Sequence, residues 1–300
     1  MPRIAQRLNL VRPLALAAGQ HDVFVCDGES DLHVVSFSQT PGALAPSPPI
    51  AAGCAGIDVG PAESSVYWTV SASASLDDRG VFRAAPGAPQ AAPERVAALT
   101  YPSDVKVVGD VVLFTGSDDT GAPRVWRTDP PYNAASVPLP GLIGTRLVIG
   151  AGDRVFVAWP EQWNIATADG VSGQGARVLV DETPNDPGDP GPVPMAADAS
   201  HLYFGMGGEL RRVRLTANLP WETVAAAQGS VSGVTRHERW VYWLVSTPGE
   251  LRRRDVDGGP VERVLDGLSS PGGLVGAERE MYWYESGDAA VVKALSWPDD

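Results

Sequence analysis

The sequence has 300 residues and a net charge of −13 at pH 7, with 44% hydrophobic and 20% charged residues. A chain of this length can bury a substantial core, either as one large all-β domain or as two ordinary domains. The acidic charge argues against binding to nucleic-acid phosphates or to anionic lipid, and no apolar run is long enough to span a membrane.

The N-terminal segment is typical of strands and not of a targeting signal. Met1-Pro2-Arg3 and the residues that follow lack the apolar core of a signal peptide. Residues 14–18 are apolar but too few for such a core, and they favour a short strand. We expect an extracytoplasmic protein, periplasmic or secreted, whose leader is absent from this chain.

A short apolar–aromatic–apolar pattern, or a close variant of it, recurs along the chain after a polar turn. Its copies are Val23-Phe24-Val25, Val66-Tyr67-Trp68, Val112-Leu113-Phe114, Val155-Phe156-Val157, Leu202-Tyr203-Phe204, Val241-Tyr242-Trp243 and Met281-Tyr282-Trp283. Their central residues lie 43, 46, 43, 47, 39 and 40 positions apart, which matches the length of one four-stranded propeller blade. We interpret each copy as the second strand of a blade, buried on both faces.

A second pattern follows most copies: an apolar residue with a basic residue two positions later. The five pairs are Val81/Arg83, Val125/Arg127, Leu210/Arg212, Leu251/Arg253 and Val291/Lys293. A spacing of two places both side chains on one face of a third strand. We interpret the basic residues as structural and expect exposed ion pairs with acids of the next turn, such as Arg253 with Asp255 or Asp257.

The repeats predict one all-β domain over residues 1–300: a seven-bladed β-propeller with four-stranded blades. The last repeat has no obvious outer strand before the sequence stops. Residues 4–11 can supply that strand, so we expect an N-terminal strand to close the last blade and cover its edge.

The copy Val66-Tyr67-Trp68-Thr69 resembles the repeats of YWTD and NHL-like propellers. The chain is most similar to divergent repeats of secreted bacterial proteins of unknown role, most clearly over residues 241–259. Val70 stands where the YWTD aspartate would be, and the other copies also lack that aspartate. This departure argues against the blade-locking network and the ligand-receptor role of that family.

Acidic residues occur in every connection between a second and a third strand. Those with the strongest claim to a ligand site are Asp118, Asp119, Glu161 and Glu285, and Glu209 and Glu250 lie in two further connections of this kind. A ring of carboxylates could bind Ca²⁺ or a cationic ligand, or hold a general base. The competing interpretation is that these residues are simply solvated turns.

Trp159 and Trp163 flank Glu161 in one of these connections. Two indole rings beside a carboxylate could stack on a sugar or on an organic cation. The competing interpretation is packing at a blade edge.

No residue is assigned a catalytic or metal-binding role. His21, His201 and His237 fall in turns on the face opposite the acidic connections, and Gly229-Ser230-Val231-Ser232-Gly233 has the wrong spacing for a nucleophile elbow. Gluconolactonase-like and virginiamycin B lyase-like propellers are enzymes on related folds. Their activity requires metal ligands or a base histidine on the ligand face, where the turn histidines do not lie.

Cys26 ends a second strand and Cys54 precedes the first strand of the next repeat. The strand directions place both residues at the same rim of adjacent blades. A disulfide between them is conceivable and would indicate an oxidising compartment. The alternative is two free, half-buried thiols.

The sequence therefore predicts a non-catalytic binding or scaffold propeller that uses an acidic loop face. The alternative is a metal-dependent lyase or lactonase-type hydrolase with its site in the central funnel. We expect a monomer without a cofactor, with Ca²⁺ as the one ion that the acidic loops would suit. Its partner would be a protein or small-molecule ligand, not a nucleic acid.

Overall fold

The computed structural model describes most of the chain, and the account below concerns that part. The described residues are 3–10, 13–19, 22–27, 32–36, 54–61, 65–71, 79–85, 93–99, 101–117, 120–132, 135–170, 172–182, 191, 193–216, 220–226, 228–286 and 290–298. The side chains of 3–10, 27, 32–36 and 151 are left out. No helix in this part of the chain is long and apolar enough to cross a membrane.

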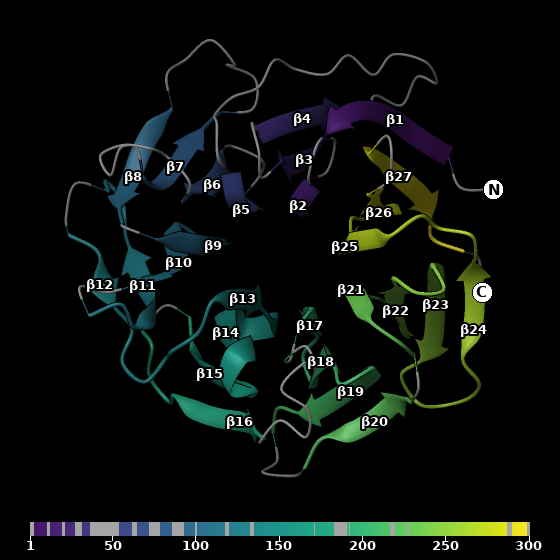
Figure 1. Ribbon diagram of the computed structural model, residues 1–300. Helices are drawn as coiled ribbons and strands as arrows, with labels where there is room; N and C mark the ends of the chain where they lie inside the picture. Colours follow the sequence, from purple (N-terminus) through teal and green to yellow (C-terminus); the bar gives the residue numbers. More distant parts are fainter. Residues whose placement is uncertain are drawn as a thin grey trace. The chain divides into compact units, whose positions relative to one another are not determined.

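The strands form antiparallel sheets, which we number in chain order (Figure 1). Sheet 1 contains β2 (Pro13–Ala18), β3 (Asp22–Asp27) and β4 (Leu32–Ser36). Sheet 2 contains β5 (Cys54–Val59), β6 (Val66–Val70), β7 (Gly80–Ala84) and β8 (Glu94–Ala98). Sheet 3 contains β9 (Pro102–Val108), β10 (Val111–Ser117), β11 (Pro123–Thr128) and β12 (Val137–Pro138).

Sheets 4 to 7 continue the same order of strands. Sheet 4 contains β13 (Arg146–Ile149), β14 (Arg154–Trp159), β15 (Asn164–Asp169) and β16 (Arg177–Asp181). Sheet 5 contains β17 (Met195–Ala197), β18 (His201–Met206), β19 (Glu209–Arg214) and β20 (Glu222–Ala225). Sheet 6 contains β21 (Val231–His237), β22 (Trp240–Val245), β23 (Glu250–Asp255) and β24 (Glu262–Leu265). Sheet 7 contains β25 (Pro271–Gly276), β26 (Glu280–Glu285), β27 (Ala290–Ser296) and β1 (Arg3–Leu10). Two short 3-10 helices flank β14, η3 (Ala151–Asp153) and η4 (Pro160–Gln162).

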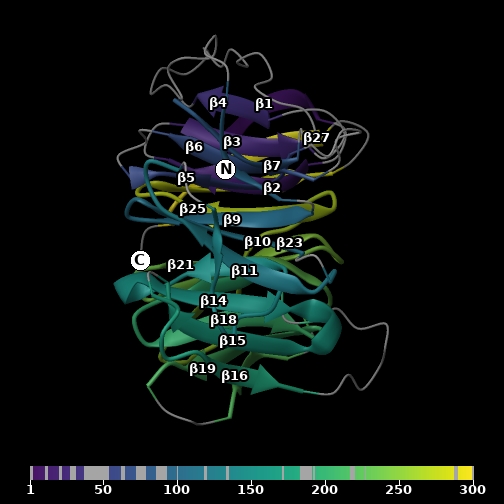
Figure 2. The same cartoon turned by 90° about the vertical axis from the view of Figure 1, so that its left-hand side faces the viewer.

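The chain divides into two compact units. Unit 1 comprises Met1–Leu139, Ala277–Tyr282 and Asp288–Asp300, and unit 2 comprises Pro140–Gly276 and Trp283–Gly287. Within unit 2, the first strands β13, β17 and β21 contact one another in succession. The fourth strands β16, β20 and β24 form the other edge of each sheet, away from these first strands (Figure 1). Figures 1 and 2 both show sheets 4 and 5 side by side.

The second strands are buried because neighbouring sheets cover both of their faces. All five residues of β6 are buried, and so are five of the six residues of β22. Third strands are less completely buried: in β19 only Leu210 and Val213 are buried, and Arg214 is exposed. This contrast is the one that the apolar–aromatic repeat predicts.

Apolar clusters lie between successive sheets and form the core. One cluster joins sheets 1 and 2, another sheets 2 and 3, another sheets 4 and 5, and another sheets 5 and 6. Trp68, Trp243 and Trp283 occupy equivalent positions on the second strands and are fully buried. Packing of consecutive four-stranded meanders face to face is the architecture of a β-propeller.

The prediction of seven four-stranded blades is wrong. In the part of the chain that the structure describes, six sheets have four strands and sheet 1 has only β2, β3 and β4. The residues after β4, 37–53, lie outside the described part.

The N-terminal strand completes the last sheet, as the missing outer strand of the final repeat predicts. β1 pairs antiparallel with β27, with Arg3 opposite Ala294 and Ile4 opposite Lys293. This pairing covers an edge that would otherwise expose unpaired backbone groups.

Candidate functional site

Each four-stranded sheet has two ends that we name for their connections. At the loop end, the second strand turns into the third, and the fourth strand leads to the next sheet. At the turn end, the first strand turns into the second. The predicted ligand residues all belong to the loop end.

The structure separates the predicted ligand residues at sheet 4. Trp159 is half-buried and Glu161 is exposed, whereas Trp163 is 4% exposed and belongs to the apolar cluster between sheets 4 and 5. The Trp163 N–H donates to the carbonyl oxygen of Pro160, and the Trp163 carbonyl accepts from the N–H of Glu182. Trp163 is therefore a packing residue, so the two indoles do not form an open stacking pair. Asp118 and Asp119 lie outside the described residues.

Glu285 is buried and anchors a connection by two hydrogen bonds. Its side chain is buried, and it accepts hydrogen bonds from the Ser269 N–H at 3.0 Å and from the Trp283 Nε1–H at 3.2 Å. Glu285 follows Trp283 by two residues, as Val70 follows Trp68. A glutamate carboxylate thus occupies, in one repeat, the position of the YWTD aspartate.

Two arginine-centred clusters recur at the loop end of sheets 5 and 6. In the first, Arg211 Nε donates to Glu209 Oε2 at 2.8 Å, and Arg211 Nη1 lies 3.1 Å from Glu182 Oε2. The Arg211 guanidinium also lies 3.8 Å from the centroid of the Trp221 ring. Glu182 follows sheet 4, so this cluster ties sheet 4 to sheet 5.

The second cluster repeats the first one sheet later. Arg252 Nε donates to Glu250 Oε2 at 2.6 Å, and Arg252 Nη1 donates to Gln228, which follows sheet 5. Arg263 Nη1 lies 3.6 Å from Glu250 Oε1. Both clusters arise from one local sequence, Gly-Glu-Leu-Arg, at residues 208–211 and 249–252. The two glutamates expected as free loop carboxylates are therefore each paired with a strand arginine, and the first cluster keeps two carboxylates against one guanidinium.

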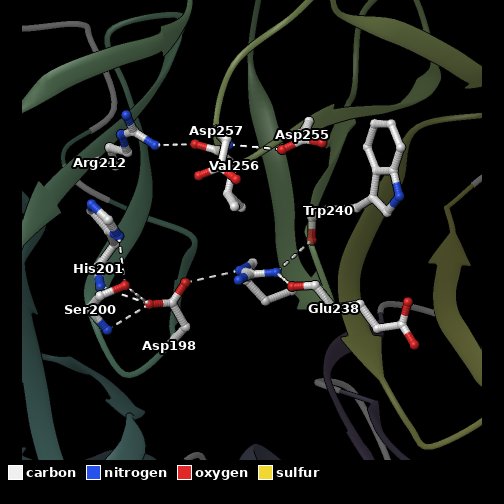
Figure 3. Close-up of polar contacts among 10 residues, drawn as sticks. Asp198, Ser200, His201, Arg212, Glu238, Trp240, Asp255, Val256 and Asp257 are labelled. Atoms are coloured by element: carbon white, nitrogen blue, oxygen red, sulfur yellow. Dashed lines mark hydrogen bonds and ion pairs between the residues drawn. The ribbon is translucent and has the colours of Figure 1, made fainter.

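A different polar cluster lies at the turn end of sheets 5 and 6 (Figure 3). The Asp198 carboxylate accepts from the Ser200 N–H at 2.7 Å, the Ser200 hydroxyl at 2.9 Å and the His201 N–H at 2.8 Å. It also accepts from Arg236 Nε of sheet 6 at 3.0 Å. Burial acts to raise the pKa of Asp198, but these hydrogen bonds outweigh burial and lower the pKa to about 2.

Asp198, Ser200 and His201 have the composition of a hydrolase triad but not its arrangement. The carboxylate accepts from the serine hydroxyl, and His201 Nδ1 lies 2.9 Å from the same hydroxyl oxygen. A triad needs the carboxylate to orient the imidazole and the imidazole to take the serine proton. Burial and the nearby Arg212 lower the pKa of His201. The cluster is a hydrogen-bonded turn that joins two sheets, which agrees with the turn interpretation of this histidine.

Three sheets carry a tyrosine, an arginine and a glutamate side by side on their second, third and fourth strands. The sets are Tyr67/Arg83/Glu94, Tyr203/Arg212/Glu222 and Tyr242/Arg253/Glu262. The arginine–glutamate distances are 2.6, 2.9 and 2.8 Å. The third-strand arginines are structural, as predicted, but the predicted partner of Arg253 is wrong. Cross-strand register brings Glu262 opposite Arg253, so the ion pair forms across the sheet and not along the chain.

Cys26 and Cys54 form a disulfide between β3 of sheet 1 and β5 of sheet 2, with their Cα atoms 5.2 Å apart. Of the two alternatives that the sequence left open, the structure contains the bonded one. Both residues are buried in the apolar cluster between these sheets.

Among the described residues, no group of three or more His, Cys, Asp or Glu side chains could hold a metal ion. The carboxylates at the loop end of sheets 5 and 6 are instead paired with arginine. The first cluster has fixed, partly exposed charges, since the Glu182 and Glu209 side chains are 23% and 26% exposed. In the second cluster the Glu250 side chain is fixed in the same way but is only 12% exposed.

Comparison with known proteins defines the fold. No family model and no curated protein sequence matches this chain. Among solved structures, it is similar to virginiamycin B lyase from Staphylococcus aureus, with 12% identity, a TM-score of 0.71 and coverage of 97% of this chain and 98% of that one. It is equally similar to Kuenenia stuttgartiensis hydrazine synthase, with 12% identity, a TM-score of 0.71 and coverage of 98% of both chains. A chain of a nidogen/laminin complex matches with 14% identity and a TM-score of 0.54, over 80% of this chain and 90% of that one.

These similarities show that the chain is an all-β protein with the β-propeller fold. The neighbours include a lyase, a hydrazine synthase and a component of a protein complex. One fold thus carries several unrelated roles, and function has to be argued from the residues of this chain.

Proposed function

We propose that the protein is a non-catalytic binding or scaffold propeller that uses the loop end of its sheets. The observation that carries this proposal is the repetition of one Gly-Glu-Leu-Arg cluster in sheets 5 and 6. Each cluster holds a carboxylate in a fixed position by an arginine of the same strand. A surface of fixed charges suits recognition, because little side-chain freedom is lost when a partner binds.

The partner best suited to this surface is a protein segment or small molecule with positive charge. The chain carries a net charge of −13, so its field attracts cations over a distance set by ionic strength. The proposed role requires neither a cofactor nor a second copy of the chain. Nothing in the two clusters resembles a nucleophile held by a base.

The experiment compares two double variants that remove the same charge from different places. Glu209→Gln/Glu250→Gln alters the loop-end clusters, and Glu222→Gln/Glu262→Gln alters glutamates that also pair with arginine but lie on the fourth strands. The probe is a fluorescently labelled oligolysine peptide, titrated at low ionic strength. We expect the loop-end variant to bind roughly fivefold more weakly than the wild type and the control variant to bind almost normally. Equal weakening by both variants would assign binding to net charge alone and reject the loop end as the site.

A metal-dependent lyase or lactonase-type hydrolase is the competing function. Thermal unfolding with and without Ca²⁺ or Mn²⁺ separates the two, because an ion that binds the folded chain raises its melting temperature by mass action. We expect no shift beyond that given by matched Mg²⁺. A rise of several degrees specific to one ion would favour the metal-dependent enzyme.

We also propose that the protein works in an oxidising, extracytoplasmic compartment. The Cys26–Cys54 disulfide supports this location, because such bonds persist outside the reducing cytoplasm. Mass spectrometry of alkylated protein, purified from its natural host without reductant, measures the oxidised fraction. A protein whose two cysteines are mostly alkylated under these conditions would belong to a reducing compartment.

A further inference from the structure

Sheet 1 is attached to sheet 2 both by contacts between strands and by a covalent bond. It has three described strands, and β2 and β3 both contact β5 of sheet 2. The apolar cluster between the two sheets takes Ala17, Phe24 and Cys26 from sheet 1. The disulfide adds a covalent attachment at the same place.

The two sulfur atoms are not accessible in the folded chain. Cys26 is 0% exposed and Cys54 is 1% exposed, and Trp68, Ile57 and Phe24 belong to the same buried cluster. Disulfide exchange requires a thiolate to reach one of the sulfur atoms. A reductant therefore cannot attack while sheets 1 and 2 are in contact.

We propose that the Cys26–Cys54 bond is a gated redox switch of sheet 1. In the oxidised chain the bond holds sheet 1 against sheet 2, and reduction proceeds only through a state in which these sheets have separated locally. In the reduced chain the separated state is much more populated, which exposes the apolar faces around Phe24 and Trp68. Sheet 1 is therefore ordered against sheet 2 when the bond is oxidised and separates from sheet 2 when the bond is reduced.

The chemistry balances with a dithiol as the reductant. One dithiol thiolate attacks a protein sulfur, the protein S–S bond breaks, and a mixed disulfide forms. The second thiolate closes the dithiol into a cyclic disulfide and releases the second cysteine. The two electrons come from the dithiol, and its two protons end on Cys26 and Cys54. Oxidation is the reverse reaction with a small-molecule or protein disulfide.

The test measures the rate of reduction by dithiothreitol, with alkylation and mass spectrometry as the readout. Because attack requires opening, we expect reduction of the native chain to be at least about 100-fold slower than reduction of the urea-unfolded chain. Equal rates in the native and unfolded chains would show accessible sulfur atoms and overturn the proposal.

Two matched valine variants then distinguish local opening from complete unfolding. Ile57 and Ile165 are both buried, at 1% and 0% exposure, but Ile57 lies beside the disulfide and Ile165 lies in unit 2 between sheets 4 and 5. We expect Ile57→Val to accelerate reduction by roughly 2- to 10-fold and Ile165→Val to leave it unchanged. If both variants accelerate reduction equally, opening is global and the switch does not exist.

Hydrogen exchange provides the second readout, which measures sheet order directly. After reduction, amide protection in β2 and β3 should fall at least about tenfold, while protection in β22 and β23 of unit 2 stays constant. Unchanged protection in β2 and β3 after complete reduction would show that the bond does not control sheet 1.

Discussion

Asp198 illustrates how one carboxylate becomes a tie between two sheets. Its neighbours Ser200 and His201 donate within the turn, and Arg236 donates from the next sheet. In the folded chain, four hydrogen bonds from the protein stabilise the charged form of the Asp198 carboxylate. Its pKa of about 2 therefore lies below the ordinary value of 3.8. The stability that this group contributes is present above about pH 4 and is lost as the pH falls towards 2.

Replacement of Asp198 by asparagine tests this contribution. We expect Asp198→Asn to lower the free energy of unfolding by about 1–2 kcal/mol at pH 7, with a difference from the wild type that disappears near pH 2. Urea unfolding at a series of pH values measures it. Asp129→Asn serves as the control, because Asp129 pairs with Arg127 at 2.7 Å but its side chain is 49% exposed. A loss that does not depend on pH would contradict this account.

Glu285 is a second residue whose role depends on two buried hydrogen bonds. Glu285→Gln keeps the shape of the side chain but replaces one acceptor oxygen with an amide donor. We expect unfolding to become easier by about 1–3 kcal/mol, because the Ser269 N–H or the Trp283 Nε1–H then loses its partner. Chemical denaturation measures the loss, and Glu161→Gln, at an exposed glutamate of the loop end, is the control. An effect of Glu285→Gln no larger than that of the control would show that the two hydrogen bonds of Glu285 do not contribute to stability.

At the scale of elements, glycine sets how closely successive first strands approach. A Cβ atom on Gly233 of β21 would lie 2.6 Å from Leu274 Cβ and 2.7 Å from Leu274 N of β25. On Gly56 of β5, it would lie 2.7 Å from the Asp104 Cα of β9. At both places the backbone of one strand lies directly against the neighbouring strand. Neither glycine can therefore carry a side chain without moving that neighbour.

Gly233→Ala tests this close packing. At an unstrained position, alanine in place of glycine stabilises a protein by about 0.4–1 kcal/mol. Here we expect a loss of about 1–3 kcal/mol in the free energy of unfolding, because the methyl group overpacks the contact between β21 and β25. Gly233→Val should lower the free energy of unfolding further than Gly233→Ala does. Denaturant unfolding of both variants measures these losses. A neutral or stabilising alanine would show that the strands can separate freely.

At the scale of the whole molecule, the disulfide should contribute more than any single contact. It links residues 28 positions apart in the sequence, and the loop-entropy relation gives about 3–4 kcal/mol for a loop of this length. We expect Cys26→Ser/Cys54→Ser to lower the free energy of unfolding by about this amount. Reductant should weaken the wild type to the same extent and leave the double variant unchanged. If reductant destabilised both proteins equally, it would be acting elsewhere.

Some of the candidate site could be read from local sequence, and the rest could not. The glutamates at 209 and 250 stand out as acids in the connections that lead to third strands, and Arg211 and Arg252 follow two positions later. The apolar-then-basic pattern indicates instead the arginines at 212 and 253, which lie on the other face of the same strands. Glu182 and Gln228 complete the clusters from preceding sheets, and no spacing in the sequence relates them to these arginines.

The sequence by itself determined the second strands and the propeller class, because burial on both faces demands an apolar–aromatic run once in each repeat. It also indicated the strand that completes the last sheet, since a missing outer strand must be supplied from elsewhere. Only the tertiary structure decided that Trp163 packs inside, that Arg253 pairs with Glu262 and that the two cysteines are bonded. These features depend on register and on distances between sheets. Such quantities come from the packing of residues far apart in the chain, on which local periodicity carries no information.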